Sequence, residues 1–550
     1  MLWKRKNREN SKKGAVMKKK AFRCKHIYTA VSPELIDGYV IIEDNRIKFV
    51  GSADEGATLI DDETEVIDVS ENFVMPGFND FHVHLISAGL LEEDGVLRYM
   101  TSEEEAAEYL YNLNKGKDKR WIMGGAWDPL LWPGQKNPTK KSLDKYFPNT
   151  PVFLLNKECH GAWVNSATLD FFGITKDTPD PQDGMYSRFE DGEPDGYVHE
   201  QAAVAMQEEI FKNITDEELA EYGLTFIRSA NQYGITSVGD VAGAAPVRPK
   251  GYKIIEDRGE LTARIFFYPS FSTGVEEINN LKKEYCSGKL ACRGVKTFID
   301  GTPQGYSGYM LEDYSDRPGN KGVPLIPEET FIKQVCEYDK AGIQTRVHAC
   351  GDAGARLCLD AIEEAQKQNG KKDLRHCVEH LESMASSDIK RFGELGVVAS
   401  VQPEHLPKYD FYEHPFHKIL GEERMKYSWP FESIRKSGGI LAFGTDCPVV
   451  DISPYRGVFR AVTRLTNNLE PEGGWTPEQR LTIHDALRAY TWGGAYATGM
   501  DDKLGTLEEG KLADIAVVEK NLFECATDIK EMFEMRAVMT ILDGEVVYKQ

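Results

Sequence analysis

The chain has 550 residues, 41% of them hydrophobic and 28% charged, the balance of a globular protein with room for a sizeable core. Its 66 basic and 88 acidic residues give a net charge of −22, which argues against nucleic acid as a partner of the main body. No stretch approaches the roughly 20 apolar residues that span a bilayer, so we expect no membrane partner.

Residues 1–20 are strongly basic and are not followed by an apolar stretch, which argues against a secretory signal. We expect a disordered tail there, with a nucleic-acid or membrane-surface arm as the alternative. The 10 cysteines are scattered without a Cys-x-x-Cys pair. This spacing favours reduced thiols in a cytoplasmic protein over a disulfide framework.

Short alternating strands are predicted near both ends of the chain. They fall within residues 21–75 and again within 501–550, where an Asp-Gly turn at 543–544 separates two strands. Two β-rich ends around a long middle segment predict one small β domain that is built from both termini.

The middle of the chain, residues 76–500, alternates short apolar strands with helical stretches. After an opening strand that ends near residue 85, strands are predicted at 235–240, 263–270, 294–300, 344–350, 375–380, 397–403 and 441–446. Helices are predicted between them, at 216–233, 328–341, 353–368 and 384–392. Eight alternating units predict an α/β fold, the closed (β/α)₈ barrel, with a parallel sheet.

The first two barrel strands are about 150 residues apart, several times the 30 or so of an ordinary βα unit. We therefore expect an insertion over the barrel mouth, at about residues 92–205. Its aromatic residues suit either a small core of its own or a lid over the site. These residues are Trp121, Trp127, Trp132, Trp163 and Tyr186.

Metal-ligating side chains recur where the predicted strands end, which is the rim that carries the chemistry of such barrels. His82 and His84 are two positions apart, so they share one face of the opening strand. Later strands end at His348, His380 and Asp446. Imidazole and carboxylate ligands favour zinc, or a similar divalent ion such as manganese or iron.

A metal at this rim would lower the pKa of a bound water toward about 7, and the resulting hydroxide is a nucleophile. Asp446 is placed to accept a proton from that water and to pass it to a leaving group. Lys296 lies four residues before Asp300, on the same strand face. As an ammonium it would repel a metal, whereas carboxylated by carbon dioxide it could bridge two cations.

These motifs resemble the amidohydrolase superfamily, specifically its YtcJ-like branch, which includes N-substituted formamide deformylases. The resemblance runs from about residue 23 onward and rests on Pro-Gly-Phe-Asn-Asp-Phe-His-Val-His at 76–84 and on several later runs. Those runs lie at 127–128, 160 with 165–166, 300–302, 347–352, 376–380, 400–403, 443–448 and 505–514.

The resemblance implies a metal-dependent hydrolase of a non-peptide C–N bond, with its small β domain a β-sandwich. It assigns the metal site to His82, His84, His348, His380 and Asp446, and it matches Lys296 to the bridging, carboxylated lysine of binuclear members. We expect one or two ions, most simply zinc. His348 and His380 also count as catalytic, because either could orient the oxyanion.

The substrate is not readable from the sequence. Trp127, His160, Tyr306 and His405 are the candidate substrate contacts, and the runs 158–160 and 302–306 depart from the pattern of the family. We expect hydrolysis of an amide, formamide or cyclic amide of a small molecule, and we leave a homodimer open. The alternatives are a metal-dependent isomerase or lyase on the same scaffold, and a catalytically inactive scaffold protein.

Overall fold

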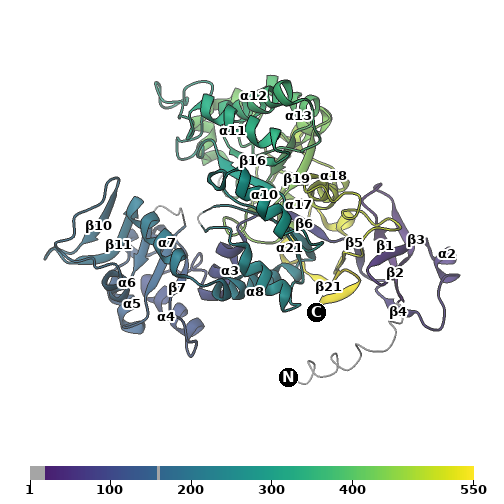
Figure 1. The fold of residues 1–550 in the computed structure, drawn as a ribbon, viewed down its shortest axis with the longest axis horizontal. Coiled ribbons are helices and arrows are strands. Elements are labelled where there is room, and N and C mark those ends of the chain that lie inside the picture. The colour runs from purple at the N-terminus through teal and green to yellow at the C-terminus, as the bar shows by residue number, and fades with distance from the viewer. Residues whose placement is uncertain (1–18, 158–160, 244, 410) are drawn as a thin grey trace.

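The computed structural model describes residues 19–157, 161–243, 245–409 and 411–550, and it has a mixed α/β fold (Figure 1). Most of the predicted basic tail lies outside these residues. Its last two residues, Lys19 and Lys20, do not belong to a tail but to strand β1 (Lys19–Tyr28). The Lys20 ammonium donates a hydrogen bond to the Gly544 carbonyl at 2.6 Å, and this bond holds the start of the strand against the sheet.

Both ends of the described chain enter one eight-stranded sheet. Its order is β22-β21-β20-β5-β1-β2-β3, with β4 also paired to β1. β5 and β20 meet antiparallel at its centre, so the N-terminal and C-terminal segments share one hydrogen-bonded layer. A two-layered sandwich stays a prediction. The remaining strands are β2 (Leu35–Glu43), β3 (Arg46–Ser52), β4 (Glu65–Asp68), β5 (Phe73–Pro76), β20 (Ile515–Val518), β21 (Ala537–Leu542) and β22 (Glu545–Lys549).

The middle of the chain forms two parallel sheets, of order β14-β13-β12-β6 and β15-β16-β17-β18-β19. Their strands are nearly all buried, as expected for parallel sheets covered by helices. The bounds are β6 (Phe78–Val83), β12 (Ile235–Val241), β13 (Arg264–Tyr268), β14 (Leu290–Cys292), β15 (Gly294–Phe298), β16 (Gln344–Ala349), β17 (Cys377–His380), β18 (Val398–Val401) and β19 (Ile440–Phe443).

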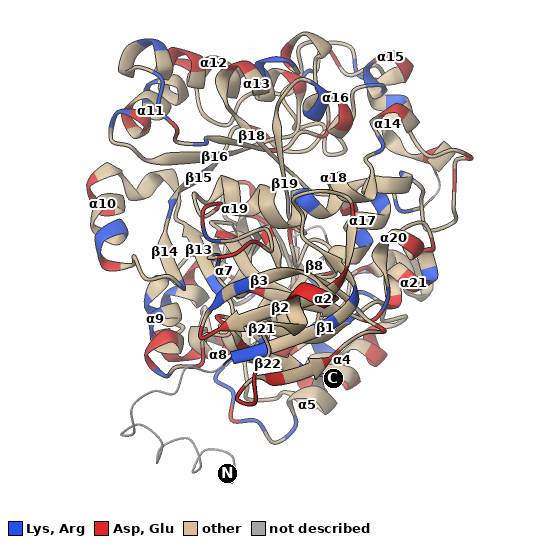
Figure 2. Cartoon of the chain, turned by 90° about the vertical axis from the view of Figure 1, so that its right-hand side faces the viewer, with Lys and Arg blue, Asp and Glu red and all other residues tan. Residues whose placement is uncertain are grey.

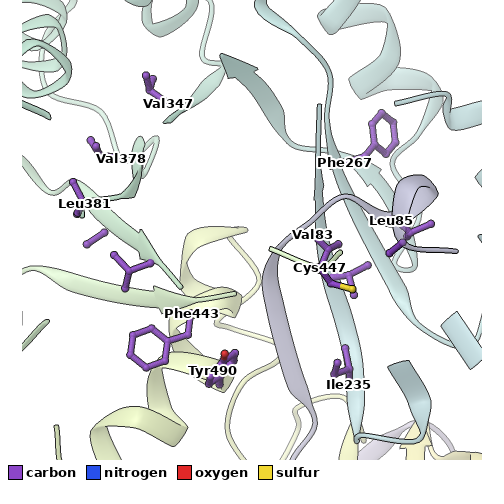
Figure 3. Packing of buried hydrophobic residues seen from close by; sticks show 14 of the residues in the cluster. Val83, Leu85, Ile235, Phe267, Val347, Val378, Leu381, Phe443, Cys447 and Tyr490 are labelled. Carbon is purple, nitrogen blue, oxygen red and sulfur yellow. The ribbon is translucent and has the colours of Figure 1, made fainter. Parts of the chain in front are cut away.

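The two parallel sheets are joined at both edges. On one side a single residue, Arg293, separates β14 from β15, so one stretch of chain pairs with β13 and then with β16. On the other side Val83 forms a parallel bridge with Cys447, and the two side chains lie side by side (Figure 3). The described residues thus contain two linked sheets rather than one continuous eight-stranded sheet, and the closed barrel stays a prediction.

Helices follow most of these strands and cover the sheets. α8 begins after Thr215, whose hydroxyl accepts from the Glu218 amide while the Glu218 carboxylate accepts from the Thr215 amide, a reciprocal cap. The helix predicted at 384–392 is wrong; a 3₁₀ turn (Ser386–Asp388) and α13 (Arg391–Leu395) take its place. The main helices are α3 (Leu85–Asp94), α8 (Asp216–Asn231), α9 (Pro249–Asp257), α10 (Val275–Glu284), α11 (Glu328–Lys340), α12 (Asp352–Asn369), α16 (Phe431–Lys436), α17 (Pro454–Thr463) and α18 (Ile483–Arg488).

The segment between β6 and β12 has a five-stranded sheet of its own, of order β10-β11-β9-β8-β7, and lies at the left of Figure 1. Trp127, Trp132 and Trp163 pack together in its core, so the core role, and not the lid role, accounts for them. Its elements are α4 (Glu103–Asn114), β7 (Ile122–Trp127), α5 (Lys140–Tyr146), β8 (Val152–Asn156), β9 (Gly161–Val164), α6 (Ser166–Phe171), β10 (Gly184–Arg188), β11 (Pro194–Glu200) and α7 (Gln201–Asn213).

Acidic and basic residues both occur along the outer helices in the view of Figure 2. Among the described residues, no helix combines the length and the apolar character needed to cross a bilayer. The nine cysteines within these residues are all free thiols.

Candidate metal centre

His82 in β6 and His84, the first residue beyond that strand, face the carboxylate of Asp446. The Nε2 atoms of His82 and His84 lie 3.5 and 3.2 Å from the same oxygen, Asp446 Oδ1. Asp446 is three residues beyond the end of β19, and its backbone amide donates to the His82 carbonyl at 2.7 Å. The end of β6 and the chain beyond β6 and β19 therefore bring His82, His84 and Asp446 together, and metal binding by these three stays a prediction.

Two further histidines approach the other oxygen of Asp446. His380 Nδ1 lies 3.9 Å and His405 Nε2 lies 3.6 Å from Asp446 Oδ2. The ligand atoms of His380, His405 and Asp446 lie within 4.8 Å of one another, and so do those of His82, His84 and Asp446. His405, predicted to contact substrate, is thus placed where it could equally bind a metal.

A third group lies on the neighbouring strand ends. The ring of His348, from β16, has its centroid 4.3 Å from that of His380. The thiol of Cys350 lies 3.3 Å from His348 Nε2, and these three residues also have ligand atoms within 4.8 Å of one another. The position of Cys350 in this group was not predicted, although its place two residues after His348 is the signal that could have revealed it.

Two residues of the site have an uncommon backbone conformation. His380 and Asp446 have φ angles of 71° and 64°, in the left-handed region that residues with a side chain rarely adopt. Such strain persists where the surrounding structure imposes it, and it is concentrated at functional sites. Here it turns both side chains toward one another at the ends of β17 and β19.

The electrostatics of the site keep His82, His348 and His380 neutral, the form that binds metals. Burial, followed by the charge of Lys296, lowers the pKa of His82 to about 4 and that of His348 to about 3. Burial alone would raise the pKa of Asp446, but the neighbouring His82 and His84 hold it below its usual range. At neutral pH the site therefore presents imidazole nitrogens around a carboxylate anion.

Lys296 lies in β15 and is 1% exposed. Burial lowers its pKa to about 8, against the attraction of Glu379. Its ammonium nitrogen, His380 Nδ1 and His405 Nε2 are buried and have no hydrogen-bond partner within the described residues. Buried polar atoms normally have partners, so the two imidazole nitrogens and the adjacent donor set fit a bound divalent cation.

A buried ion pair between Glu379 and Arg346 contacts the ring of His82. Glu379 Oε2 lies 2.5 Å from His82 Nδ1, while Glu379 Oε1 accepts from Arg346 Nε at 2.7 Å. Burial would raise the pKa of Glu379, but the charges of Arg346 and His82 hold it well below its usual value. An ionised carboxylate on Nδ1 fixes the orientation of a ligating histidine.

A cavity of about 200 Å³ opens beside His84. Its walls come from α3, the inserted sheet, α7 and the chain after Asp446, and they are mainly apolar. Ala126, whose φ of 62° is in the left-handed region, contributes to the wall. The most prominent apolar wall residues are Leu90, Leu91, Met123, Phe153, Leu155 and Phe211.

Two of the other predicted substrate contacts, Trp127 and Tyr306, make their hydrogen bonds to residues outside the candidate metal centre. Trp127 is fully buried within the inserted sheet, where its indole nitrogen donates to the Leu154 carbonyl at 2.9 Å. The Tyr306 hydroxyl donates a hydrogen bond to Asp316 at 2.8 Å, and the Arg317 guanidinium stacks on the Tyr306 ring. His160 lies outside the described residues. Substrate contact by these three stays a prediction.

Comparison with known proteins identifies the family to which this chain belongs. The sequence model of the amidohydrolase family matches residues 65–548, and the chain belongs to that family. The resemblance read from the motifs is thereby confirmed.

Three curated relatives cover most of the chain. Protein LONG AFTER FAR-RED 3 of Arabidopsis thaliana is 31% identical, over 95% of this chain and 90% of that protein. The putative amidohydrolase YtcJ of Bacillus subtilis is 27% identical over 95% and 98%. An N-substituted formamide deformylase of Arthrobacter pascens is 26% identical over 93% and 95%.

A solved structure has the same fold. An uncharacterized metal-dependent hydrolase from Pyrococcus horikoshii superposes with a TM-score of 0.76 at 24% identity, over 93% of this chain and 99% of that one.

Proposed function

We propose that this protein is a metal-dependent hydrolase that cleaves a non-peptide C–N bond, in an amide, formamide or cyclic amide, of a small molecule. The observation that carries the proposal is the convergence of His82, His84, His380 and His405 on the two oxygens of Asp446. Membership of the amidohydrolase family supports it, as does the N-substituted formamide deformylase among the relatives. The proposal takes the two linked parallel sheets as a (β/α)₈ barrel, with the site at its carboxyl rim.

Zinc is the ion that the donor set favours, since neutral imidazoles and one carboxylate are its usual ligands at catalytic sites. His82, His84 and Asp446 would hold it, and His348 and His380 would take part in a second ion site. When bound, such an ion supplies the Lewis acidity that lowers the pKa of water toward about 7 and polarises a carbonyl.

Asp446 is the proposed proton carrier. Its carboxylate is ionised at neutral pH, so it can accept the proton that the attacking water loses and deliver it to the departing nitrogen. His348 and His380 are neutral at that pH and lie at the same rim, where they can orient the carbonyl oxygen of the substrate.

Lys296 is the proposed bridge between two ions. Its lowered pKa leaves a fraction of the amine neutral near pH 8. A neutral amine adds to carbon dioxide, forming an N–C bond and releasing a proton, and the product is a carbamate anion. The buried Lys296 ammonium, which has no hydrogen-bond partner within the described residues, would thereby become an anion that can bind two metal ions.

The cavity beside His84 is the proposed location of the apolar part of the substrate. Its aliphatic and aromatic walls would bury an alkyl or aryl substituent of the amide, at about 25 cal/mol for each Å² removed from water. Asp446 and the cavity residues Pro448 and Val449 lie on one short stretch of chain, so the reacting bond would lie at the inner end of the cavity.

The proposal is tested by metal analysis of purified protein, followed by a screen of N-acyl, formamide, cyclic amide and carbamate compounds. We expect one or two divalent ions per chain and stoichiometric release of amine and acid. Turnover without a change of substrate mass would instead indicate an isomerase, and loss of carbon dioxide from a compound that is not a carbamate would indicate a lyase. Protein that binds no added zinc and turns over none of these compounds would indicate an inactive scaffold, which the complete set of ligands argues against.

A further inference from the structure

We propose that the thiolate of Cys350 is a protein ligand of the second cation, which it binds together with His348 and His380. This inference deepens the proposed metal dependence and rests on it. It does not rest on the proposed hydrolytic reaction.

The local backbone brings the thiol to the site. β16 ends at Ala349, so Cys350 is the first residue beyond the strand, and its thiol lies 3.3 Å from Nε2 of His348, two positions before it. The Cys350 amide donates to Asp300 Oδ1 at 3.0 Å and the Gly351 amide to Asp300 Oδ2 at 2.8 Å. The buried carboxylate of Asp300 therefore fixes the chain at the point where the thiol leaves it.

The distances are those of a coordination sphere. Zinc lies about 2.3 Å from a thiolate sulfur and about 2.0 Å from a histidine nitrogen, so two such ligands at a tetrahedral angle lie roughly 3.5 Å apart. Cys350 Sγ and His348 Nε2 are 3.3 Å apart, and all three residues offer ligand atoms within 4.8 Å of one another.

A second observation points to a ligand at this place. His380 is 4% exposed, and its Nδ1 has no hydrogen-bond partner within the described residues. Its ring lies between those of His348 and His82, with centroids 4.3 and 5.0 Å away. A buried imidazole with an unpartnered nitrogen, placed against a second imidazole and a thiol, is accounted for by an ion that all three share.

A sulfur ligand changes which ions the site selects. Thiolate is a softer donor than carboxylate, so a site of two imidazoles and one thiolate favours zinc or cobalt over manganese or magnesium. Binding exchanges the S–H bond for a sulfur–metal bond and releases one proton to solvent. The second ion then has three protein ligands without any contribution from Lys296.

Cobalt(II) absorption tests this directly, because a thiolate ligand gives cobalt a near-ultraviolet charge-transfer band that nitrogen and oxygen ligands do not. Metal-free full-length protein is titrated with Co²⁺ alone, with no substrate. We expect the band in the wild type and its loss in Cys350→Ser, together with a weaker second binding event. Cys358→Ser is the matched control: Cys358 is equally buried, eight residues further along in α12, and belongs to none of the candidate groups, so it should keep the band.

Two results would overturn the inference: a wild type that binds two Co²⁺ ions without the band, or a Cys350→Ser variant that keeps it. If Cys350→Ser fails to fold, alkylation of the wild type gives the answer. Zinc should slow the labelling of Cys350, read by peptide mapping, and leave Cys358 unaffected; equal rates for Cys350 with and without zinc reject the proposal. None of these readouts requires turnover, so a failure of the proposed hydrolysis is seen separately.

Discussion

His82 Nδ1 and Glu379 Oε2 lie 2.5 Å apart, although 297 positions separate the two residues in the chain. Because Nδ1 is engaged by the carboxylate, the opposite nitrogen of the ring is the one that faces Asp446. Arg346 binds the other oxygen of Glu379, and Arg346 itself stacks against Phe81 and Tyr268. The tautomer of one ligand thus depends on an ion pair buried between β16 and β17.

Glu379→Gln should weaken metal binding by about 10- to 100-fold, the usual cost of removing the partner of a ligating histidine. The amide cannot hold His82 as an anion does, and it leaves the Arg346 charge buried and unpaired. Competition with a chromogenic chelator measures the affinity. Arg264→Met is the control, since it breaks a buried ion pair far from the histidines and should destabilise the fold without altering metal affinity. Equal affinity in Glu379→Gln and wild type would contradict the orienting role.

Asp446→Asn should lower kcat by about 10²- to 10⁴-fold, because an amide cannot accept the proton of the attacking water. His82, His84 and His380 remain as ligands, so most of the bound metal should be retained. Elemental analysis and turnover of the best amide from the screen are measured on the same preparation. Activity within a few-fold of wild type would show that another group carries the proton.

The order of the main elements could be predicted because each depends on local pattern. Buried parallel strands read as short apolar runs, and β6, β12, β16 and β18 lie within a few residues of the positions expected. The tail was placed two residues too far, because a lysine-rich run gives no sign that Lys20 will bond to Gly544. The helix expected at 384–392 is wrong, because the chain there forms a 3₁₀ turn at Ser386–Asp388 and starts α13 only at Arg391.

The candidate ligands were also predictable, since strand ends of such folds converge, but the contacts among them were not. Asp80, two residues before His82, accepts hydrogen bonds from the amide and hydroxyl of Thr445. Its partner lies 365 positions away, and only tertiary structure brings the two together. The same holds for His405, whose approach to Asp446 depends on the short 3₁₀ turn Pro403–His405.

Arg264 joins the parallel strands to the terminal sheet. Its guanidinium donates to both oxygens of Asp514 at 2.7 and 2.8 Å and to Asp543 at 2.5 Å. Arg264→Met should lower the free energy of unfolding by about 3–5 kcal/mol, because it leaves a buried carboxylate without its partner. Arg120→Met breaks the exposed pair with Glu218 and should cost no more than about 1 kcal/mol. Urea denaturation of both variants compares them, and similar losses would contradict the structural role of Arg264.

Asp240 predicts a pH dependence of stability. Burial raises its pKa from 3.8 to about 6, while it accepts hydrogen bonds from the Leu85 amide and the Tyr252 hydroxyl. Between pH 4 and about 6 the folded chain holds a proton that the unfolded chain has lost, so this group's contribution to stability falls as pH rises through that window and is constant above it.

Asp240→Asn mimics the protonated acid at every pH, so the difference between variant and wild type isolates this group. The variant should gain stability relative to wild type between pH 4 and 6, by at most about 1.4 kcal/mol for each pH unit. Urea denaturation at pH 4.5, 5.5 and 7.5, in matched ionic strength, measures the difference. A difference that does not change with pH would show that Asp240 titrates normally.

Leu155 forms part of the apolar wall beside His84, and filling the cavity there should change which amides are accepted. Leu155→Trp should raise KM for a formamide with a benzyl substituent by about tenfold or more, since burial of such a group contributes about 1.5–3 kcal/mol. N-methylformamide needs no such space and should keep its kcat/KM. Leu131→Trp adds the same ring to the inserted segment at a position that is 54% exposed, and it should alter neither substrate. If Leu155→Trp slows both formamides equally, the cavity does not hold the substituent, and the apolar group must bind elsewhere on the rim.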